Sequence, residues 1–199
     1  METTMQKQTQ IKKYKKKEVK LRDIYSRCLI TKQILLPIGA IHKNITESIE
    51  NSISFHYEGK CINEGYVKPG SSKIISYSSG IIERGVNISF EVVFECMVCF
   101  QVEGALISCV AKNITKAGIK AESATETPSP IVVFIARDHY YMNSYFSSIQ
   151  EGDPIMIRVI GQRFELNDKY ISIIAELVSP KTYEDMQKPP GTKKMITTK

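Results

Sequence analysis

Two cysteines three residues apart form the pattern in this sequence that comes nearest to a metal site. Cys96 and Cys99 make its one Cys-x-x-Cys motif. A zinc site needs four ligands that converge as a tetrahedron, and neither a second cysteine pair nor a histidine pair lies nearby. Residues three apart on a strand point to opposite faces, so we interpret both cysteines as core residues and expect no metal.

The other residue types that carry catalysis are scattered. The three histidines, His42, His56 and His139, do not stand beside a cysteine or serine in a nucleophile motif. The sequence has no glycine-rich phosphate loop, and the carboxylates of residues 23–180 are spread singly. We therefore expect no catalytic residues, no cofactor and no enzyme activity of the chain itself.

What remains is the chemistry of binding single-stranded nucleic acid. Lys120 and Arg158 are predicted to point outward from strands whose neighbouring residues fill a core, and to share one groove. His139 and Tyr140 would flank that groove and stack on bases. For each side chain the alternative is an ordinary solvated surface. The candidate RNA-binding residues are Lys120, Arg137, His139, Tyr140, Arg158, Arg163 and Lys169.

The N-terminal half of the sequence predicts a mixed α+β unit. Residues 24–36 read as a strand that Pro37 ends, and isoleucine at every fourth position from 41 to 53 indicates an amphipathic helix that Gly59 ends. Segments 61–67 and 73–79 are predicted to form a hairpin through the turn at 68–71. Strict alternation from Val86 to Phe100 predicts a long strand with one buried face, long enough to run from one domain into the next.

The C-terminal half predicts a small barrel. Five short strands are expected at 104–113, 118–124, 131–136, 154–164 and 169–177, with a tyrosine-rich connection at 140–149. A five-stranded OB barrel carries its connecting segment at that place. The fold class is thus α+β or mostly β. The expected parts are a disordered basic arm (1–20), an N-terminal domain (21–100), the barrel (101–179) and a disordered tail (180–199).

Charge is concentrated at the two ends of the chain. The net charge is +6 over 199 residues, and residues 1–22 alone carry +6, with eight basic against two acidic side chains. Residues 181–199 carry +3, which leaves the body at −3. A body without a basic face is not expected to grip duplex DNA. The arm is either a solvated tail or a patch for nucleic acid or nuclear targeting.

Several patterns bear on the compartment. No apolar run approaches the roughly 20 residues that span a bilayer, and no secretory signal is expected. The five cysteines are an odd number, which argues against a disulfide framework. We therefore expect a reducing, intracellular environment.

The order of elements, with several short motifs, resembles a known family. It is similar to the larger, OB-barrel-containing stalk subunit of multi-subunit DNA-directed RNA polymerases of eukaryotes, archaea and some large DNA viruses, and most like the viral members. The resemblance covers about residues 22–178. Its motifs are Leu36-Pro37, Glu58-Gly59-Lys60-Cys61 with Gly65-Tyr66-Val67, the strand at 90–100, Glu103-Gly104 with Val110 and Gly118-Ile119, the Pro-Ile-Val-Val-Phe-Ile run at 130–135, and the segment 160–168.

The resemblance implies a ribonucleoprotein-like tip domain that docks on the polymerase core, and a barrel that projects toward nascent single-stranded RNA. It also implies a helical partner subunit packed along both domains, as a heterodimer. Such a subunit works by tethering RNA and proteins to the polymerase, and it catalyses no bond formation or cleavage. Its place would be the host cytoplasm, in a viral factory, or the virion if viral, and the nucleus if cellular. The implied docking residues are Gly59, Cys61, Gly65, Lys68, Pro69 and Gly70.

Other functions stay open at this point. The chain could be a stalk paralogue that serves another polymerase class. It could be an OB-fold decoy that mimics a translation factor, although a decoy would need only the barrel. A free RNA chaperone would be monomeric and basic throughout its body. Co-elution with large polymerase subunits discriminates among these functions.

Overall fold

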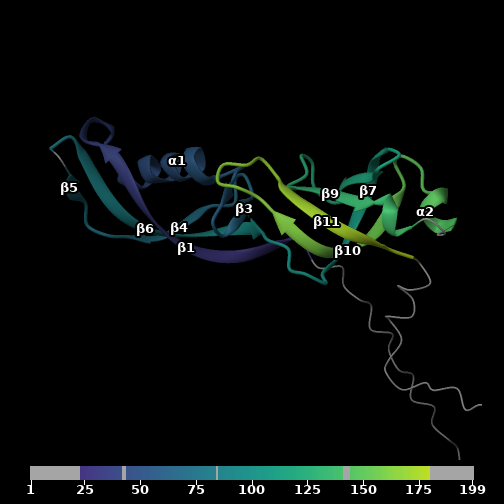
Figure 1. The fold of residues 1–199 in the computed structure, drawn as a ribbon. Coiled ribbons are helices and arrows are strands. Elements are labelled where there is room, and N and C mark those ends of the chain that lie inside the picture. The colour runs from purple at the N-terminus through teal and green to yellow at the C-terminus, as the bar shows by residue number, and fades with distance from the viewer. Residues whose placement is uncertain (1–22, 42–43, 84, 141–143, 180–199) are drawn as a thin grey trace, which may run out of the picture.

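The computed structural model describes residues 23–41, 44–83, 85–140 and 144–179, and shows a long sheet joined end to end with a small barrel (Figure 1). Strands dominate and helices are few, which confirms the mostly β class. The likeness of the N-terminal part to a ribonucleoprotein fold stays a prediction. The arm predicted for 1–20 and the tail predicted for 180–199 lie outside the described residues.

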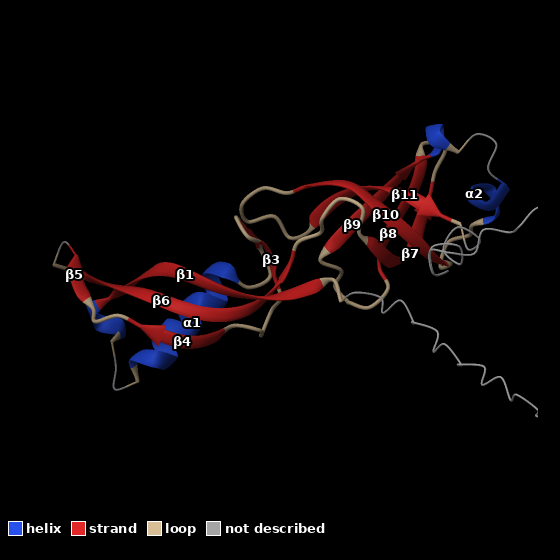
Figure 2. Ribbon diagram, turned by 90° about the horizontal axis from the view of Figure 1, so that it is seen from below, coloured by secondary structure: helices blue, strands red, loops and turns tan. Residues whose placement is uncertain are grey.

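Strand β6 (Asn87–Cys99) is the centre of the N-terminal sheet. Strand β1 (Tyr25–Pro37) pairs antiparallel with one edge of β6 along its whole length. Short strands share the other edge in succession, as Figure 2 shows from below. These are β3 (Gly65–Val67), β4 (Lys73–Tyr77) and β5 (Ile81–Glu83), and β2 (Cys61–Ile62) pairs with β3.

The predicted alternation is confirmed from Phe90 to Val98, where the even positions of β6 are buried, but it is wrong at its two ends, because Val86 and Phe100 are 63% and 50% exposed. Helix α1 (Ile45–Tyr57) covers this face with Ile49 and Ile53. The predicted isoleucine stripe began earlier, at Ile41. The helix starts later because a short 3-10 turn, η1 (Ile38–Ala40), comes first and the Asn44 side chain caps α1 by accepting from the N–H of Glu47.

The predicted hairpin between 61–67 and 73–79 is wrong. The hairpin lies within the first segment, as β2 and β3, whereas β4 pairs with β6. The N–H of Lys68 donates to the carbonyl of Met97 at 2.9 Å, so the chain stays on the same edge of β6 and continues along it. The turn that follows is held against the end of α1, because the Glu58 carboxylate accepts from the N–H groups of Gly70 and Ser72.

The C-terminal part is a closed five-stranded barrel with the strand order β10-β11-β9-β8-β7, which confirms the predicted barrel. Strands β9 and β11 are parallel and the other pairs are antiparallel. This is the connectivity of an OB barrel, with η2 (Arg137–His139) and α2 (Ser144–Ser148) between the third and fourth strands. The strands are β7 (Leu106–Ile114), β8 (Gly118–Ser123), β9 (Ile131–Ala136), β10 (Pro154–Arg163) and β11 (Ile171–Val178).

Main-chain hydrogen bonds join the sheet to the barrel. The N–H of Cys61 donates to the carbonyl of Asp168 at 2.8 Å, and the N–H of Asn167 donates to the carbonyl of Cys61 at 2.9 Å. The hydrophobic cluster of the barrel continues across this junction to Tyr25 and Tyr66. The two parts therefore share a core at their contact, and a domain boundary at residue 100 stays a prediction.

Gly65 lets β3 approach β6 closely, and its replacement should be costly. Its φ is +129°, and a Cβ atom there would overlap the carbonyl oxygen of Cys99 and lie 2.9 Å from the Val98 side chain. We expect Gly65→Ala to lower the free energy of unfolding by about 2 kcal/mol or more in urea denaturation. Gly39→Ala is the control, because nothing lies within 4 Å of a Cβ there. Equal losses from both variants would contradict this account.

Glu58 should make stability depend on acid pH. Burial raises the pKa of its carboxyl, but hydrogen bonds from the N–H groups of Gly70 and Ser72 and from the Ser54 hydroxyl outweigh it, so the pKa lies below its ordinary value of 4.5. The stabilisation is therefore complete above the unfolded-state pKa and is lost as pH falls through the folded-state pKa. We expect the Tm difference between the native chain and Glu58→Gln to shrink below about pH 4.5. Glu50→Gln, on the exposed side of α1, is the control. A difference that stays constant down to about pH 3 would refute the assignment.

Candidate functional site

The two cysteines of the Cys-x-x-Cys motif lie in different cores. Cys96 packs in the cluster under α1, whereas Cys99 packs in the cluster that continues into the barrel. Burial raises the pKa of each thiol to about 11. Within the described part of the chain, no group of three or more His, Cys, Asp or Glu residues could hold a metal ion. No helix there is long and apolar enough to cross a membrane.

The six residues predicted to dock on a polymerase lie where the sheet meets the barrel. Cys61 and Gly65 are buried at this junction, and Gly59 follows the cap of α1 in a left-handed conformation. Pro69 and Gly70 are exposed in the turn beside it. Cys61 and Gly65 contact other parts of the chain itself. Of Cys61, Gly65, Pro69 and Gly70, only the last two are exposed enough to contact a partner. A docking role for the set stays a prediction.

Lys68, the remaining member of that set, links three elements. Its ammonium group forms an ion pair of 2.9 Å with Glu126, in the loop between β8 and β9, and lies 4.9 Å from the ring centre of Tyr25 in β1. A cation over an aromatic ring is attracted by the ring electrons, and the carboxylate balances the charge. Lys68 thus holds the barrel loop against the start of the sheet.

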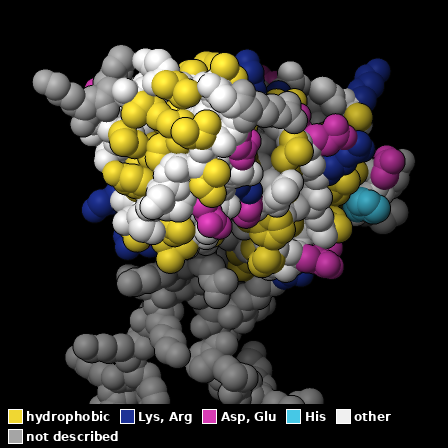
Figure 3. Space-filling view, turned by 90° about the vertical axis from the view of Figure 1, so that its left-hand side faces the viewer, with side chains coloured by type: hydrophobic (Ala, Val, Ile, Leu, Met, Phe, Trp, Pro, Cys, Tyr) yellow, Lys and Arg dark blue, Asp and Glu magenta, His cyan; other side chains and the backbone are white. Residues whose placement is uncertain are grey.

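An apolar surface at the free end of the sheet was not predicted from the sequence. Five side chains there are between 46% and 68% exposed, and we name them the distal patch: Leu35, Ile38, Ile81, Ile82 and Val86. Leu35 and Ile81 both lie opposite Ser89, and the N–H of Ile38 donates to the carbonyl of Val86. Figure 3 views this end directly and shows hydrophobic side chains grouped on it. The signal in the sequence was the Ile81-Ile82 pair, which breaks the alternation of a half-buried strand.

Lys120 and Arg158 do not share a groove. They belong to β8 and β10, which lie on either side of β7. Their partners on β7, Asn113 and Leu106, are roughly 20 Å apart along the strand. Arg158 also lies 3.6 Å from the Glu176 carboxylate. Barrel closure therefore directs the two cations to different sides.

Two other candidates hold the connection between β9 and β10. The Arg137 guanidinium donates to the carbonyl of Thr115 at 3.1 Å and lies 5.3 Å from the ring centre of Phe146. Tyr140 stacks on the same Phe146 ring at 5.1 Å, and its hydroxyl accepts from the N–H of Leu177 at 2.7 Å. Burial raises the pKa of Tyr140. These contacts give both side chains an internal role.

The remaining candidates are exposed but lie apart. His139 is on η2, and Lys169 is on the loop between β10 and β11. Arg163 ends β10 and pairs with Glu165 at 3.1 Å. An RNA-binding role for any of the seven candidates stays a prediction.

An exposed aromatic ring beside Lys120 was missed. Phe134 on β9 is 41% exposed and lies directly between Lys120 on β8 and Ile174 on β11. We name these three residues the barrel row. The second and third strands form the usual ligand-binding face of OB barrels, and bases stack on aromatic side chains there. The alternation of residues 131–136 already places Phe134 on the outward face of its strand, so the sequence contained the information that predicts its exposure.

A second apolar surface crosses the junction. Phe100 and Val102 follow β6 and are about half exposed, and the ring of Phe100 meets that of Phe164 edge-on at 6.3 Å. Ile160, on β10, is exposed nearby, where the N–H of Gly104 donates to the carbonyl of Val159. Phe100, Val102 and Ile160 form what we name the junction strip.

Sequence comparison relates the chain to a viral protein. No protein-family model matches the chain. Over 174 residues the chain is 28% identical to the protein described as putative DNA-directed RNA polymerase subunit L376 of Acanthamoeba polyphaga mimivirus. The alignment covers 77% of this chain and 81% of that protein. The chain is thus similar, over most of its length, to a protein described as a putative RNA polymerase subunit of a mimivirus, and this confirms the predicted relationship to a viral RNA polymerase subunit.

Proposed function

We propose that the chain is a non-catalytic stalk subunit of a viral DNA-directed RNA polymerase, at work in the infected host cell. The observation that carries the proposal is the end-to-end join of the sheet and an OB-like barrel through main-chain hydrogen bonds at Cys61. That join makes a spacer with an apolar free end and a nucleic-acid-binding type of barrel at the other end. The mimivirus relative supports the assignment to a polymerase.

The distal patch is the proposed docking surface on the polymerase core. Its five apolar side chains belong to β5 and the segments beside it, which Figure 1 shows at the end of the sheet farthest from the barrel, and Figure 3 shows hydrophobic side chains grouped at that end. Clustered exposed apolar side chains commonly mark protein interfaces. The Pro69-Gly70 turn is a second proposed contact, because both residues are exposed beside the junction.

The junction strip is the proposed seat of a second, helical stalk subunit. It spans the sheet and the barrel, so a helix lying on it would contact both parts at once. Covering Phe100 and Val102 would remove apolar surface from water, which favours association. The partner would then fix the direction in which the barrel projects.

The barrel row is the proposed contact for nascent single-stranded RNA. Phe134 offers a ring for stacking, and Lys120 offers a cation for phosphate beside it. Neither interaction reads a particular base, so binding should have little sequence preference. The body's net charge of −3 opposes RNA, and affinity should fall with salt.

Docking can be tested with the affinity-tagged full chain in infected cells. We expect large polymerase subunits to co-purify with the native chain. Ile81→Ser with Ile82→Ser should reduce their recovery at least tenfold, on the order of the loss from two apolar anchors. Ile75→Ser is the control, because Ile75 is also exposed but lies on β4, away from the distal patch. Equal recovery with all three proteins would exclude the patch as the docking surface.

The RNA contact can be tested by titration of labelled single-stranded RNA with the full chain. Lys120→Ala with Phe134→Ala should weaken binding by about tenfold, since stacking contributes roughly 1–3 kcal/mol per base. Arg158→Ala is the matched control, because it removes one cation from another side of the barrel. If only the Arg158 variant weakens binding, the RNA lies along β10 instead.

A further inference from the structure

An exposed aromatic residue of the N-terminal part has no role in the core. Phe55, in the last turn of α1, is 74% exposed, while Ile49 and Ile53 form the buried stripe of that helix. The Lys60 ammonium lies 5.4 Å from the ring centre of Phe55 and donates to the Phe55 carbonyl at 2.9 Å. One exposed ring alone means little, so its neighbours decide what it can do.

The surface beside Phe55 leads directly to the barrel. Cys61, which follows Lys60, is bonded through its main chain to Asn167 and Asp168 in the loop between β10 and β11. The next two residues of that loop are Lys169, which is exposed, and Tyr170, which is 48% exposed. The cation and ring at the end of α1 therefore adjoin a second cation and ring.

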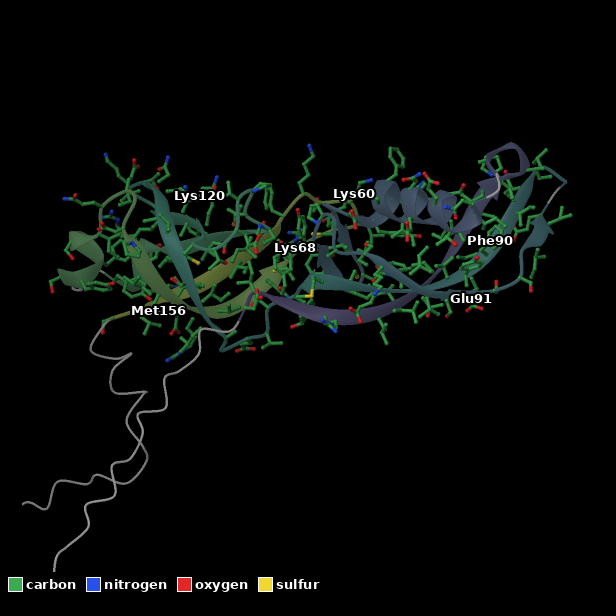
Figure 4. All side chains as sticks on the ribbon, turned by 180° about the vertical axis from the view of Figure 1, so that it is seen from behind. Lys60, Lys68, Phe90, Glu91, Lys120 and Met156 are labelled. Atoms are coloured by element: carbon green, nitrogen blue, oxygen red, sulfur yellow. The ribbon has the colours of Figure 1, made fainter. Side chains whose placement is uncertain are left out.

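The same face continues along β11 to the barrel row. Ser172 and Ile174 point outward with Tyr170, because alternate residues of a strand share a face. Ile174 lies opposite Phe134, roughly 13 Å beyond Tyr170, and Phe134 lies opposite Lys120. Figure 4 shows Lys60 and Lys120 projecting from the same side of the molecule, the side that carries α1.

We propose that this face is one continuous track for single-stranded RNA, on which Phe55 is a second base-stacking platform outside the barrel. The track consists of Phe55, Lys60, Lys169, Tyr170, Phe134 and Lys120. It rests on the proposed RNA contact of the barrel and extends that contact onto the N-terminal part. The track combines three rings with three cations, and stacking together with phosphate contacts binds single strands without reading their sequence.

The charges of the described residues favour this face. Lys60, Lys120 and Lys169 form no ion pair with a carboxylate of the described part of the chain, whereas Arg158 and Arg163 each lie within ion-pair distance of one. The three lysines can therefore meet phosphate without breaking an ion pair. Acidic neighbours of the track include Asp168, whose carboxylate accepts from the N–H of Glu165, Glu122 on β8, and Glu176 on the same face of β11 as Ile174. Binding should consequently be weak and sensitive to salt.

Two RNA lengths separate the track from the barrel site. A single OB barrel covers about 4–16 nucleotides, so an oligonucleotide of about 8 occupies the barrel and one of about 25 can also reach α1. In titrations of the full chain, Phe55→Ala should weaken the long RNA by about fivefold or more and leave the short RNA unchanged. Leu29→Ala, an equally exposed apolar residue on the opposite face of the sheet, is the control. The basic ends are identical in every variant, so a difference in affinity between variants comes from the substituted side chain.

The outcomes distinguish the track from the proposed function. If Phe134→Ala weakens both RNAs and Phe55→Ala weakens neither, the track is overturned and the barrel site stands. If Phe134→Ala has no effect on either length, the barrel site itself fails. Ultraviolet cross-linking of the native chain gives a second measurement that needs no variant. The peptide containing Phe55 should cross-link to the long RNA alone, and its absence from the cross-linked peptides would overturn the track.

Discussion

Pairing along both edges of β6 is the constraint on which the structure depends. One edge holds β1 over its full length, and the other holds β3, β4 and β5 in turn. The strand therefore has a fixed course from the free end of the sheet to the junction. Just after its end, the backbone N–H of Gln101 donates to the side-chain oxygen of Gln162 on β10. The side-chain amide of Gln101 donates to the backbone carbonyl of Ile24. Strand β6 thus sets the orientation of the barrel, which follows it in the chain.

The junction also changes what the barrel offers to a ligand. In OB barrels, the loop between the fourth and fifth strands often contacts nucleic acid. Here the backbone of that loop is bonded to Cys61, so its conformation is fixed by the N-terminal part. The loop keeps Lys169 and Tyr170 exposed, which places a cation and a ring between the two parts of the molecule. A loop that is fixed in this way loses less conformational entropy when a ligand binds it.

Ion pairs determine which cations of the acidic body remain available. Lys32 and Lys68 each form an ion pair of 2.9 Å with a glutamate, and Arg163 forms one of 3.1 Å. Such pairs at a surface contribute little to stability. They nevertheless neutralise basic side chains that a simple count of lysines and arginines would treat as available for RNA binding. The distribution of pairs, more than the net charge, therefore limits where phosphate can bind.

The sequence by itself determined the long strands, the helix α1 and the buried face of each. The alternation from Phe90 to Val98 and the isoleucine stripe of α1 are local patterns, because the side-chain period of a strand or helix depends only on the chain itself. The spacing of five short strands with a connection after the third likewise predicted the barrel. Period two does not say which strand lies at an edge, so the pairing of β4 with β6 was missed.

Tertiary structure alone decided which side chains meet. Lys120 and Arg158 both point outward, as predicted, but barrel closure turns them to different sides and sets Phe134 beside Lys120. Cys61 and Gly65 belong to a recognisable motif, yet both are buried, Cys61 against a barrel loop and Gly65 against Cys99 of β6. The exposure of Phe55 and Ile81 likewise depends on which neighbours cover them. Such contacts join residues far apart in the chain, and no local period encodes them.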